Sequence, residues 1–257
     1  MSSATVQVLP DKDAVATAAA MALTARLREV LARDQEAHLA LTGGSLGSLL
    51  WAAVTAGGAT RVDWSRVRVW WGDERWLPAG DPDRNDTQND AAGLAGLGLD
   101  PAKVHRVAGP DVAPTTEEAA LAYAATLQAH GKGNWDIVIL GVGPDGHVAS
   151  LFPHHLAQRV TDATTVAVHN SPKPPPSRVS LTFPCLNRAE SVWFVVAGAD
   201  KAQAVADGVP GTADAWDVPC AGVHGTRETT WFVDVAAAGS LQPAPAGPAR
   251  PLEPLSE

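Results

Sequence analysis

One stretch decides the fold: Asp136-Ile-Val-Ile-Leu-Gly-Val-Gly-Pro-Asp-Gly-His-Val-Ala-Ser-Leu-Phe-Pro153. Its unbroken apolar run, Ile137-Val-Ile-Leu140, is typical of a central parallel strand that is buried on both faces. The glycines that follow allow a sharp turn and let peptide N–H groups approach a ligand, and we expect a short helix after them. Asp145 and His147 end this turn. A histidine beside a carboxylate at the carboxyl edge of a parallel sheet is placed for acid–base chemistry.

The composition is that of a globular protein with an acidic balance. The chain has 257 residues, 46% of them hydrophobic, and a formal net charge of −9. This length suits one large α/β domain, or a main domain with a small appendage. The sequence has no basic stripe, signal-peptide pattern or membrane-length apolar run, and its two cysteines, Cys185 and Cys220, have no metal or disulfide spacing. We therefore expect a cytoplasmic protein without nucleic-acid or membrane partners, in which any bound anion needs a local cationic pocket.

Predicted strands and helices alternate along the chain. Short apolar runs predict strands at residues 6–9, 39–41, 67–71, 137–140, 178–183, 192–196 and 230–233. Helical spacing of apolar residues predicts helices at residues 11–32, 45–56, 115–130 and 200–206. This order predicts an α/β fold with a doubly wound, mostly parallel sheet flanked by helices, a Rossmann-like three-layer sandwich with a small antiparallel addition. We expect one domain over residues 1–239 and a loosely held Pro/Ala-rich tail over 240–257.

Four of the predicted strands end in residues that can carry chemistry. They are Thr42-Gly-Gly-Ser45 after the second strand, Asp73-Glu-Arg75 after the third, Asp145 and His147 after the fourth, and Gly198-Ala-Asp-Lys201 after the strand at 192–196. In such sheets, ligands bind outside the carboxyl ends of the strands. We therefore expect these four turns to meet at one edge of the sheet, although they lie far apart in the chain.

Two of these turns have a structural alternative to anion binding. Because Thr42-Gly-Gly-Ser45 leads into a helix, Ser45 is either an N-cap or part of a turn whose N–H groups hold a phosphate. It is not a Walker loop, since the Gly-Lys-Ser/Thr ending is missing. Similarly, Asp200 is a candidate helix cap, and Lys201 is either a surface cation or a phosphate ligand.

The acidic and histidine residues also have two interpretations each. The run Asp73-Glu-Arg75 is either solvated or part of a site, and its place directly after a tryptophan pair favours the site. Asp145 can cap the turn and also orient His147. His154 and His155 suggest a metal site with His147, but their spacing matches no known ligand pattern, so we expect no metal.

Six segments together resemble a known family. They are Leu41-Thr-Gly-Gly-Ser45, Trp71-Gly-Asp-Glu-Arg-Trp-Leu-Pro78, Asp83-Arg-Asn-Asp86, Leu140-Gly-Val-Gly-Pro-Asp-Gly-His-Val-Ala-Ser-Leu-Phe-Pro153, Arg178-Val-Ser-Leu-Thr182 and Ala199-Asp-Lys201. In this order they are similar to the 6-phosphogluconolactonases, within the wider group that also holds glucosamine-6-phosphate deaminase. The deaminases typically continue Asp-Gly-His with Ile-Ala-Phe-Asn-Glu-Pro. Here Val-Ala-Ser-Leu-Phe-Pro follows, which is the lactonase form and lacks the further acid.

The chain departs from the family pattern at two places. The family's phosphate turn usually continues with Thr-Pro after Gly-Gly-Ser, whereas this chain has Leu46-Gly47. This difference matters little if backbone N–H groups bind the phosphate. The family often has Pro-Gly after Leu-Phe, whereas this chain has Pro153-His154-His155, which leaves the conformation of that loop open.

The resemblance implies hydrolysis of 6-phospho-D-glucono-1,5-lactone to 6-phosphogluconate, in the oxidative pentose phosphate pathway. His147 is the implied general base, kept neutral by the positive end of the expected helix and oriented by Asp145 or Asp73. Backbone N–H groups of the glycine turn are candidates for holding the oxyanion. The phosphate ligands that the resemblance implies are Gly43, Gly44, Ser45, Arg75, Arg178 and Lys201.

Other consequences and alternatives remain at this point. Arg178 opens its predicted strand, so it reaches the same edge only if that strand runs antiparallel or the preceding loop folds back. We expect no cofactor, a small-molecule sugar-phosphate lactone as the partner, no nucleic-acid or membrane partner, and a monomer or weak homo-oligomer. The alternatives are an amino-sugar-phosphate deaminase/isomerase, which the missing acid disfavours, and a non-catalytic sugar-phosphate-binding domain.

Overall fold

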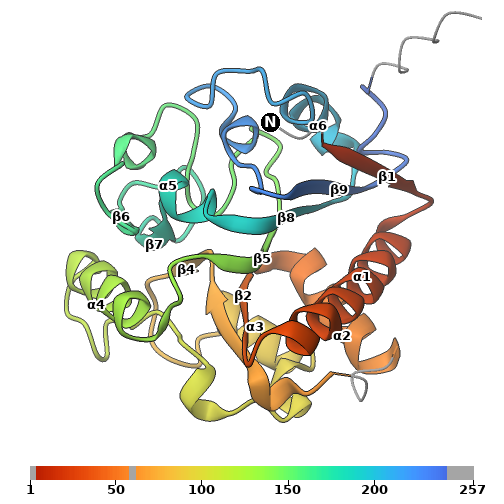
Figure 1. The fold of residues 1–257 in the computed structure, drawn as a ribbon. Helices are drawn as coiled ribbons and strands as arrows, with labels where there is room; N and C mark the ends of the chain where they lie inside the picture. Colours follow the sequence, from red (N-terminus) through yellow and green to blue (C-terminus); the bar gives the residue numbers. More distant parts are fainter. Residues whose placement is uncertain (1–3, 58–61, 242–257) are drawn as a thin grey trace, which may run out of the picture.

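A computed structural model describes residues 4–57 and 62–241. Within these residues, the main sheet has six strands, and each strand runs parallel to its neighbours (Figure 1). Across the sheet, the order is β1 (Thr5–Leu9), β9 (Glu228–Asp234), β8 (Ala189–Val196), β5 (Trp135–Leu140), β2 (Ala37–Leu41) and β3 (Val67–Trp71). The predicted doubly wound parallel sheet is confirmed. The part of the predicted tail beyond Leu241 lies outside the described residues.

A second, antiparallel sheet forms the predicted small addition. Its order is β4 (Asp73–Arg75), β7 (Arg178–Leu181) and β6 (Thr165–Val168). Gly72 joins the two sheets, because its N–H donates to Leu41 O at 2.9 Å and its carbonyl accepts from Leu181 N at 2.8 Å. The charged run after β3 is thus a strand and not a loop. Because β7 is antiparallel to β4, its first residue reaches the carboxyl edge of the main sheet.

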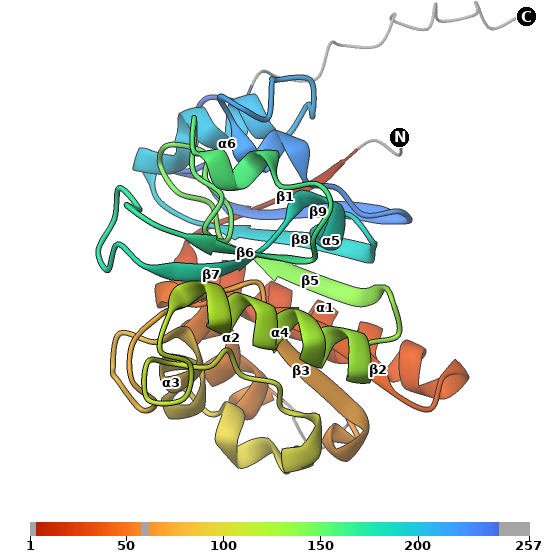
Figure 2. The same cartoon turned by 90° about the vertical axis from the view of Figure 1, so that its left-hand side faces the viewer.

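Helices cover both faces of the main sheet. On one face lie α1 (Lys12–Arg33) and α2 (Gly44–Gly57). On the other lie α4 (Thr116–His130), α5 (Phe183–Leu186), α6 (Ala202–Gly208) and the small sheet, and Figure 2 shows α4 beside β6 and β7. Strand residues alternate between the two cores: Ile137 and Ile139 face α1 and α2, and Val138 and Leu140 face the opposite side. This alternation follows from the two-residue period of a strand.

The remaining helical elements are short. α3 (Asn85–Ala91) follows β4 closely, and the 3-10 turns are η2 (Trp64–Arg66), η3 (Leu94–Leu97), η4 (Pro101–Lys103), η5 (Leu156–Arg159), η6 (Ala199–Lys201) and η7 (Pro219–Gly222). α1 and α4 begin at side-chain caps: Asp11 accepts from Ala14 N at 2.8 Å, and Thr115 accepts from Glu118 N at 3.1 Å. None of the described helices is both long enough and apolar enough to cross a bilayer.

Candidate active site

The predicted site residues meet in a cavity of about 190 Å³ at the carboxyl ends of β2 and β5. Within the described part of the chain, its lining holds four cationic side chains and one carboxylate, that of Asp73. The lining residues are Thr42, Gly43, Gly44, Asp73, Arg75, Asn85, Gly141, Val142, Gly143, His147, Ala149, Lys173, Arg178 and Lys201. Of the nine residues predicted for the site, seven line this cavity, and Asp145 and Ser45 do not.

Cavity size does not identify this site. A cavity of about 650 Å³ lies at the opposite ends of the strands, beside α4. Its lining is dominated by small and apolar residues, and among the described residues it holds one arginine, Arg188, one aspartate, Asp162, and His38. The smaller cavity concentrates four cations, a histidine and glycine turns at the strand ends, where α/β sheets bind ligands. We therefore take it as the candidate site.

His147 and Asp145 form a close pair at the glycine turn. Nδ1 of His147 lies 2.5 Å from Oδ1 of Asp145, and the same oxygen accepts the backbone N–H of His147 at 3.4 Å. Burial acts to raise the pKa of Asp145, but the hydrogen bond and charge of His147 outweigh it and lower that pKa to about 2. An ionised Asp145 accepts a hydrogen bond from the N–H at Nδ1, which assigns Nε2 of a neutral ring as the basic nitrogen.

Gly143 makes room for this imidazole. A Cβ at Gly143 would overlap Nδ1 and Cε1 of His147 and Oδ1 of Asp145. The N–H of Gly143 also donates to His147 O at 2.9 Å, which closes the turn. On its other side the ring packs against Phe152, with ring centroids 4.5 Å apart. A residue with any side chain at position 143 would therefore displace the His147–Asp145 pair.

The prediction of a helix after the glycine turn is wrong. Leu151 N donates to Val148 O at 2.9 Å, and Ala149 has φ +48°, so this segment is a tight turn. Val148, Ser150 and Leu151 are fully buried, which an amphipathic surface helix would not allow. A helix dipole therefore does not act on His147, and the carboxylate of Asp145 orients its ring instead.

Asp73 does not orient His147, which decides between the two carboxylates proposed for that role. Its Oδ2 accepts from Ser150 Oγ at 2.6 Å and lies 3.7 Å from Nη1 of Arg178. Its backbone carbonyl and Oδ1 accept from the carboxamide of Asn85 at 2.8 and 3.2 Å. Asp73 thus fixes the wall of the cavity opposite the glycine turn.

The predicted phosphate turn is divided between two cavities. Gly43 and Gly44 line the His147 cavity and also a neighbouring cavity of about 300 Å³, and Lys201 lines both. Ser45 lines only the neighbouring cavity. Because α2 begins at Gly44, Ser45 lies in its first turn and is not the N-cap. Ser45 thus lies beside Gly43, Gly44 and Lys201 but outside the His147 cavity, and its role in binding the phosphate stays a prediction.

The three predicted cationic ligands are held in different ways. Nη1 of Arg75 donates to Asp83 O at 2.5 Å, and Nζ of Lys201 lies 2.9 Å from Oδ2 of Asp200, which forms no helix cap. Arg178, 5% exposed, pairs with Arg75 in the antiparallel register. This confirms that an antiparallel strand brings Arg178 to the site.

The guanidinium group of Arg178 forms most of its hydrogen bonds with the preceding loop. Its Nε donates to Pro175 O at 3.1 Å, and its Nη2 donates to Lys173 O at 3.1 Å and Pro174 O at 3.0 Å. Lys173 itself lines the cavity, and the sequence interpretation missed it. The proline-rich composition of its loop indicated only a turn, since nothing in the sequence showed which way the lysine faces.

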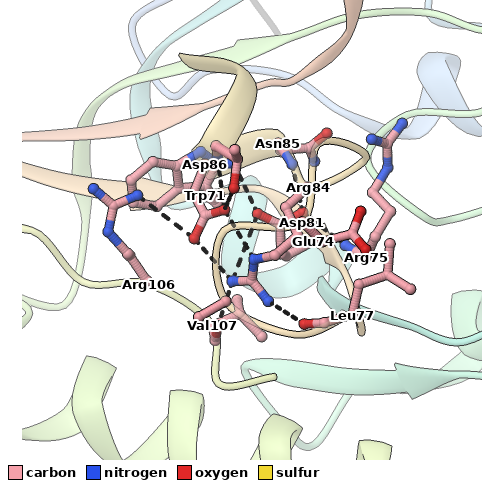
Figure 3. Close-up of polar contacts among 12 residues, drawn as sticks. Trp71, Glu74, Arg75, Leu77, Asp81, Arg84, Asn85, Asp86, Arg106 and Val107 are labelled. Carbon is pink, nitrogen blue, oxygen red and sulfur yellow. Dashed lines mark hydrogen bonds and ion pairs between the residues drawn. The ribbon is translucent and has the colours of Figure 1, made fainter. Parts of the chain in front are cut away.

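A buried acidic cluster beneath the cavity was also missed (Figure 3). The carboxylate of Glu74 accepts the backbone N–H groups of Arg75, Asn85 and Asp86 at 2.8, 2.7 and 2.9 Å. Arg84 binds both oxygens of Asp86, at 2.9 and 2.8 Å. Burial and the Asp86 carboxylate raise the pKa of Glu74 to about 8. The cluster fixes the start of α3, and the Asp83-Arg-Asn-Asp86 segment was the available signal for it.

Asn85 is the member of this segment that reaches the cavity. A Cβ at Gly43 would overlap its carboxamide oxygen, so Asn85 lies directly against the backbone of the glycine turn after β2. Its Oδ1 has no hydrogen-bond partner among the described residues, and its side chain is 2% exposed. The close packing of Asn85 therefore requires glycine at position 43 and explains why this turn contains that glycine.

The histidines suggested for a metal site do not converge. Both ring nitrogens of His155 have backbone partners, Ala157 N at 3.1 Å and His169 O at 2.8 Å. His154 faces Trp216, with ring centroids 5.7 Å apart. Among the described residues, no three His, Cys, Asp or Glu side chains are arranged to hold a metal ion.

Comparison with known proteins identifies the family. A family model described as glucosamine-6-phosphate isomerases/6-phosphogluconolactonase matches residues 10–231. The chain belongs to this family. A 6-phosphogluconolactonase from Streptomyces coelicolor is 46% identical over 242 residues, covering 90% of this chain and 92% of that protein. One from Mycobacterium tuberculosis is 38% identical, covering 93% and 99%. The solved structure of a 6-phosphogluconolactonase from Trypanosoma brucei, at 23% identity, has the same fold, with a TM-score of 0.80 and coverage of 93% and 99%.

Within this family pattern, the loop after Pro153 keeps a glycine-like conformation. His154 stands where the family often has glycine, and its φ is +59°, in the left-handed region. Its N–H donates to Trp216 O at 3.0 Å, and its Nε2 lies 3.6 Å from Oδ1 of Asp217. The substitution has therefore preserved the backbone path that glycine favours, at the cost of some backbone strain.

Proposed function

We propose that the protein hydrolyses 6-phospho-D-glucono-1,5-lactone to 6-phosphogluconate, with His147 as the general base. The observation that carries this proposal is the His147–Asp145 pair beside a cavity whose lining holds four cations and one carboxylate. The family membership supports the lactone as substrate, since the relatives at 46% and 38% identity are 6-phosphogluconolactonases.

The pair supplies the acid–base chemistry. Neutral His147 removes a proton through Nε2 from a water molecule, whose oxygen bonds to the lactone carbonyl carbon. Asp145 stabilises the imidazolium that results, as the lowered pKa of that carboxyl indicates. When the bond from the carbonyl carbon to the ring oxygen breaks, His147 returns its proton to that oxygen. The product acid then ionises to a carboxylate.

The cations supply the binding of the phosphate. Arg75 and Lys201 flank the backbone of Gly43 and Gly44, which begins α2. Helix N-termini and charged donors are the usual ligands of phosphate groups in proteins. Arg75 donates to Asp83 O, and Lys201 pairs with the carboxylate of Asp200. Each side chain has further N–H donors that can bind an anion.

The test is a paired activity assay. Purified protein is given fresh 6-phosphogluconolactone, with spontaneous hydrolysis subtracted, and separately glucosamine 6-phosphate, each with and without EDTA. We expect rapid lactone hydrolysis, no ammonia release, and equal rates with EDTA, since a lactone reacts with an activated water without a Lewis acid. Ammonia release without lactone hydrolysis contradicts the proposal. Loss of activity in EDTA that one divalent ion restores contradicts the metal-free mechanism.

A further inference from the structure

The glycine turn cannot hold the oxyanion through its glycine N–H groups. Gly141 N donates to Thr42 Oγ1 at 3.2 Å, Gly143 N to His147 O at 2.9 Å, and Gly146 N to Gly143 O at 3.0 Å. These three donors are already used inside the protein. These glycine N–H groups are therefore not free to stabilise the tetrahedral intermediate, and its negative charge calls for a further donor.

Lys173 is the cation that lies beside the catalytic pair. Its Nζ is 4.0 Å from Oδ1 of Asp145, the oxygen that contacts His147. No hydrogen bond to this Nζ occurs among the described residues, and its side chain is 41% exposed. Arg75, Arg178 and Lys201 differ in this respect, because each has a hydrogen-bond or ion-pair partner within 3.1 Å.

The backbone of Lys173 is held in place, although its ammonium group has no hydrogen-bond partner among the described residues. Ser171 Oγ donates to Lys173 O at 2.9 Å, and Arg178 donates to the same carbonyl and to Pro174 O and Pro175 O. Arg178 is itself buried and lies 3.7 Å from Asp73. A buried guanidinium thus fixes the loop that carries a partly exposed cation, an arrangement suited to placing that cation over a bound substrate.

We propose that Lys173 is a catalytic residue that binds the oxyanion formed at the lactone carbonyl, and that Arg178 is the residue that positions its loop. This inference rests on the proposed lactonase function. The lactone carbonyl is neutral, whereas the tetrahedral intermediate and the product carboxylate are negative at the same carbon. An ammonium group there interacts more strongly with the transition state and the product than with the substrate, so it raises kcat rather than lowering KM.

The experiment compares Lys173→Met with Lys201→Met and Lys173→Arg in the full chain. Each variant is assayed for kcat, KM and the inhibition constant of 6-phosphogluconate. For Lys173→Met we expect kcat to fall about 10- to 100-fold, the lower part of the range for loss of an oxyanion donor, because the site is partly solvated. We expect KM to stay within about 3-fold and the product inhibition constant to rise about 10-fold. Lys201→Met should mainly raise KM, and Lys173→Arg should restore part of kcat.

The outcomes separate this inference from the proposed function. Lys173 is half-exposed, so its substitution should leave thermal unfolding unchanged. Wild-type kcat in Lys173→Met, or a raised KM with unchanged kcat, overturns the inference and leaves the lactonase function standing. A lower kcat with an unchanged product inhibition constant also overturns it, because Lys173 would then act only through Asp145. A wild-type protein without lactonase activity overturns the function and the inference together.

Discussion

The two edges of the parallel sheet differ in their balance of charged side chains. The amino edge is the edge of the main sheet at which β2, β3, β5 and β8 begin. Acidic and basic side chains neutralise one another there. The pairs there are Arg33–Glu190, Lys132–Asp136, Arg68–Glu36 and Lys103–Glu36, at 2.7–3.0 Å. At the carboxyl edge, the cavity lining holds four cations and one carboxylate. A protein with a net charge of −9 thus keeps a local positive excess at the edge where we propose that an anionic substrate binds.

The histidines of the two edges show the same contrast. At the amino edge, His105 stacks on Trp70 with centroids 4.0 Å apart, and Nη1 of Arg68 lies 2.8 Å from its Nε2. Burial, with the charge of Arg68 next in importance, lowers the pKa of His105 to about 4. At the carboxyl edge, a carboxylate contacts His147 instead. A neighbouring cation keeps an imidazole neutral and inert, whereas a neighbouring carboxylate prepares it to accept a proton.

The largest effect that we predict is a loss of kcat when residues at the carboxyl edge are changed. His147→Gln should lower kcat about 10²- to 10⁴-fold, the range for loss of a general base, while the protein stays folded. Gly143→Ala should lower kcat by a similar factor, because its Cβ would take the space of the imidazole. The measurement is steady-state lactonase kinetics, with circular dichroism to verify folding. His105→Phe is the matched control and should keep wild-type kcat, and a folded His147→Gln variant with wild-type kcat would exclude His147 as the base.

The next largest effect concerns His105 at the amino edge, and it is a change in how the free energy of unfolding depends on pH. A folded-state pKa of about 4, below the ordinary 6.5, means that His105 contributes stability above pH 6.5 that is lost as the pH falls toward 4. Between pH 7 and pH 5 this loss is about 2 kcal/mol. His105→Phe keeps a ring on Trp70 but does not titrate, so its free energy of unfolding should fall by about 2 kcal/mol less over that interval. Urea unfolding at both pH values measures this, and identical pH dependence in both proteins would contradict it.

The smallest effect tests the loop where this chain departs from its family. His154→Gly should change the free energy of unfolding by no more than about 1 kcal/mol, because relief of the positive φ offsets the lost contact with Trp216. His154→Val should destabilise the protein by about 2 kcal/mol, since a β-branched residue tolerates that conformation poorly. Thermal or urea unfolding of the two variants compares them directly. Equal stability of the two variants would show that the left-handed conformation is not required.

Much of the fold could be predicted because it depends on local pattern. The apolar run at residues 137–140 predicted β5, and Asp11 followed by helical spacing predicted α1. The short helix expected after His147 was wrong because burial on all sides, not periodicity, determines that turn. The sequence also missed β6 and α3, and it showed β4 only as a charged run, because such short strands depend on their partners.

The pairing of His147 with Asp145 could be predicted from neighbouring residues, whereas the prediction that Arg178 belongs to the site depended on the family resemblance. His147 and Asp145 are two positions apart, so their pairing follows from a single turn. Lys173 was missed because its position depends on Arg178, which holds its loop by hydrogen bonds to backbone carbonyls. Arg75 meets Arg178 only through the register of β4 and β7. Contacts of this kind arise from tertiary pairing and have no local signature in the sequence.

The central claim is that cations at the carboxyl edge bind the phosphate group of the substrate beside His147, the proposed general base. Its most direct test is kcat/KM of the wild-type protein on 6-phosphogluconolactone and on glucono-1,5-lactone, repeated for Lys201→Met. Two charge-assisted hydrogen bonds of about 1.5–3 kcal/mol each predict a preference for the phosphorylated lactone of at least about 100-fold. Loss of Lys201 should reduce that preference about 10-fold or more. Equal kcat/KM on the two lactones in the wild-type protein would contradict the account.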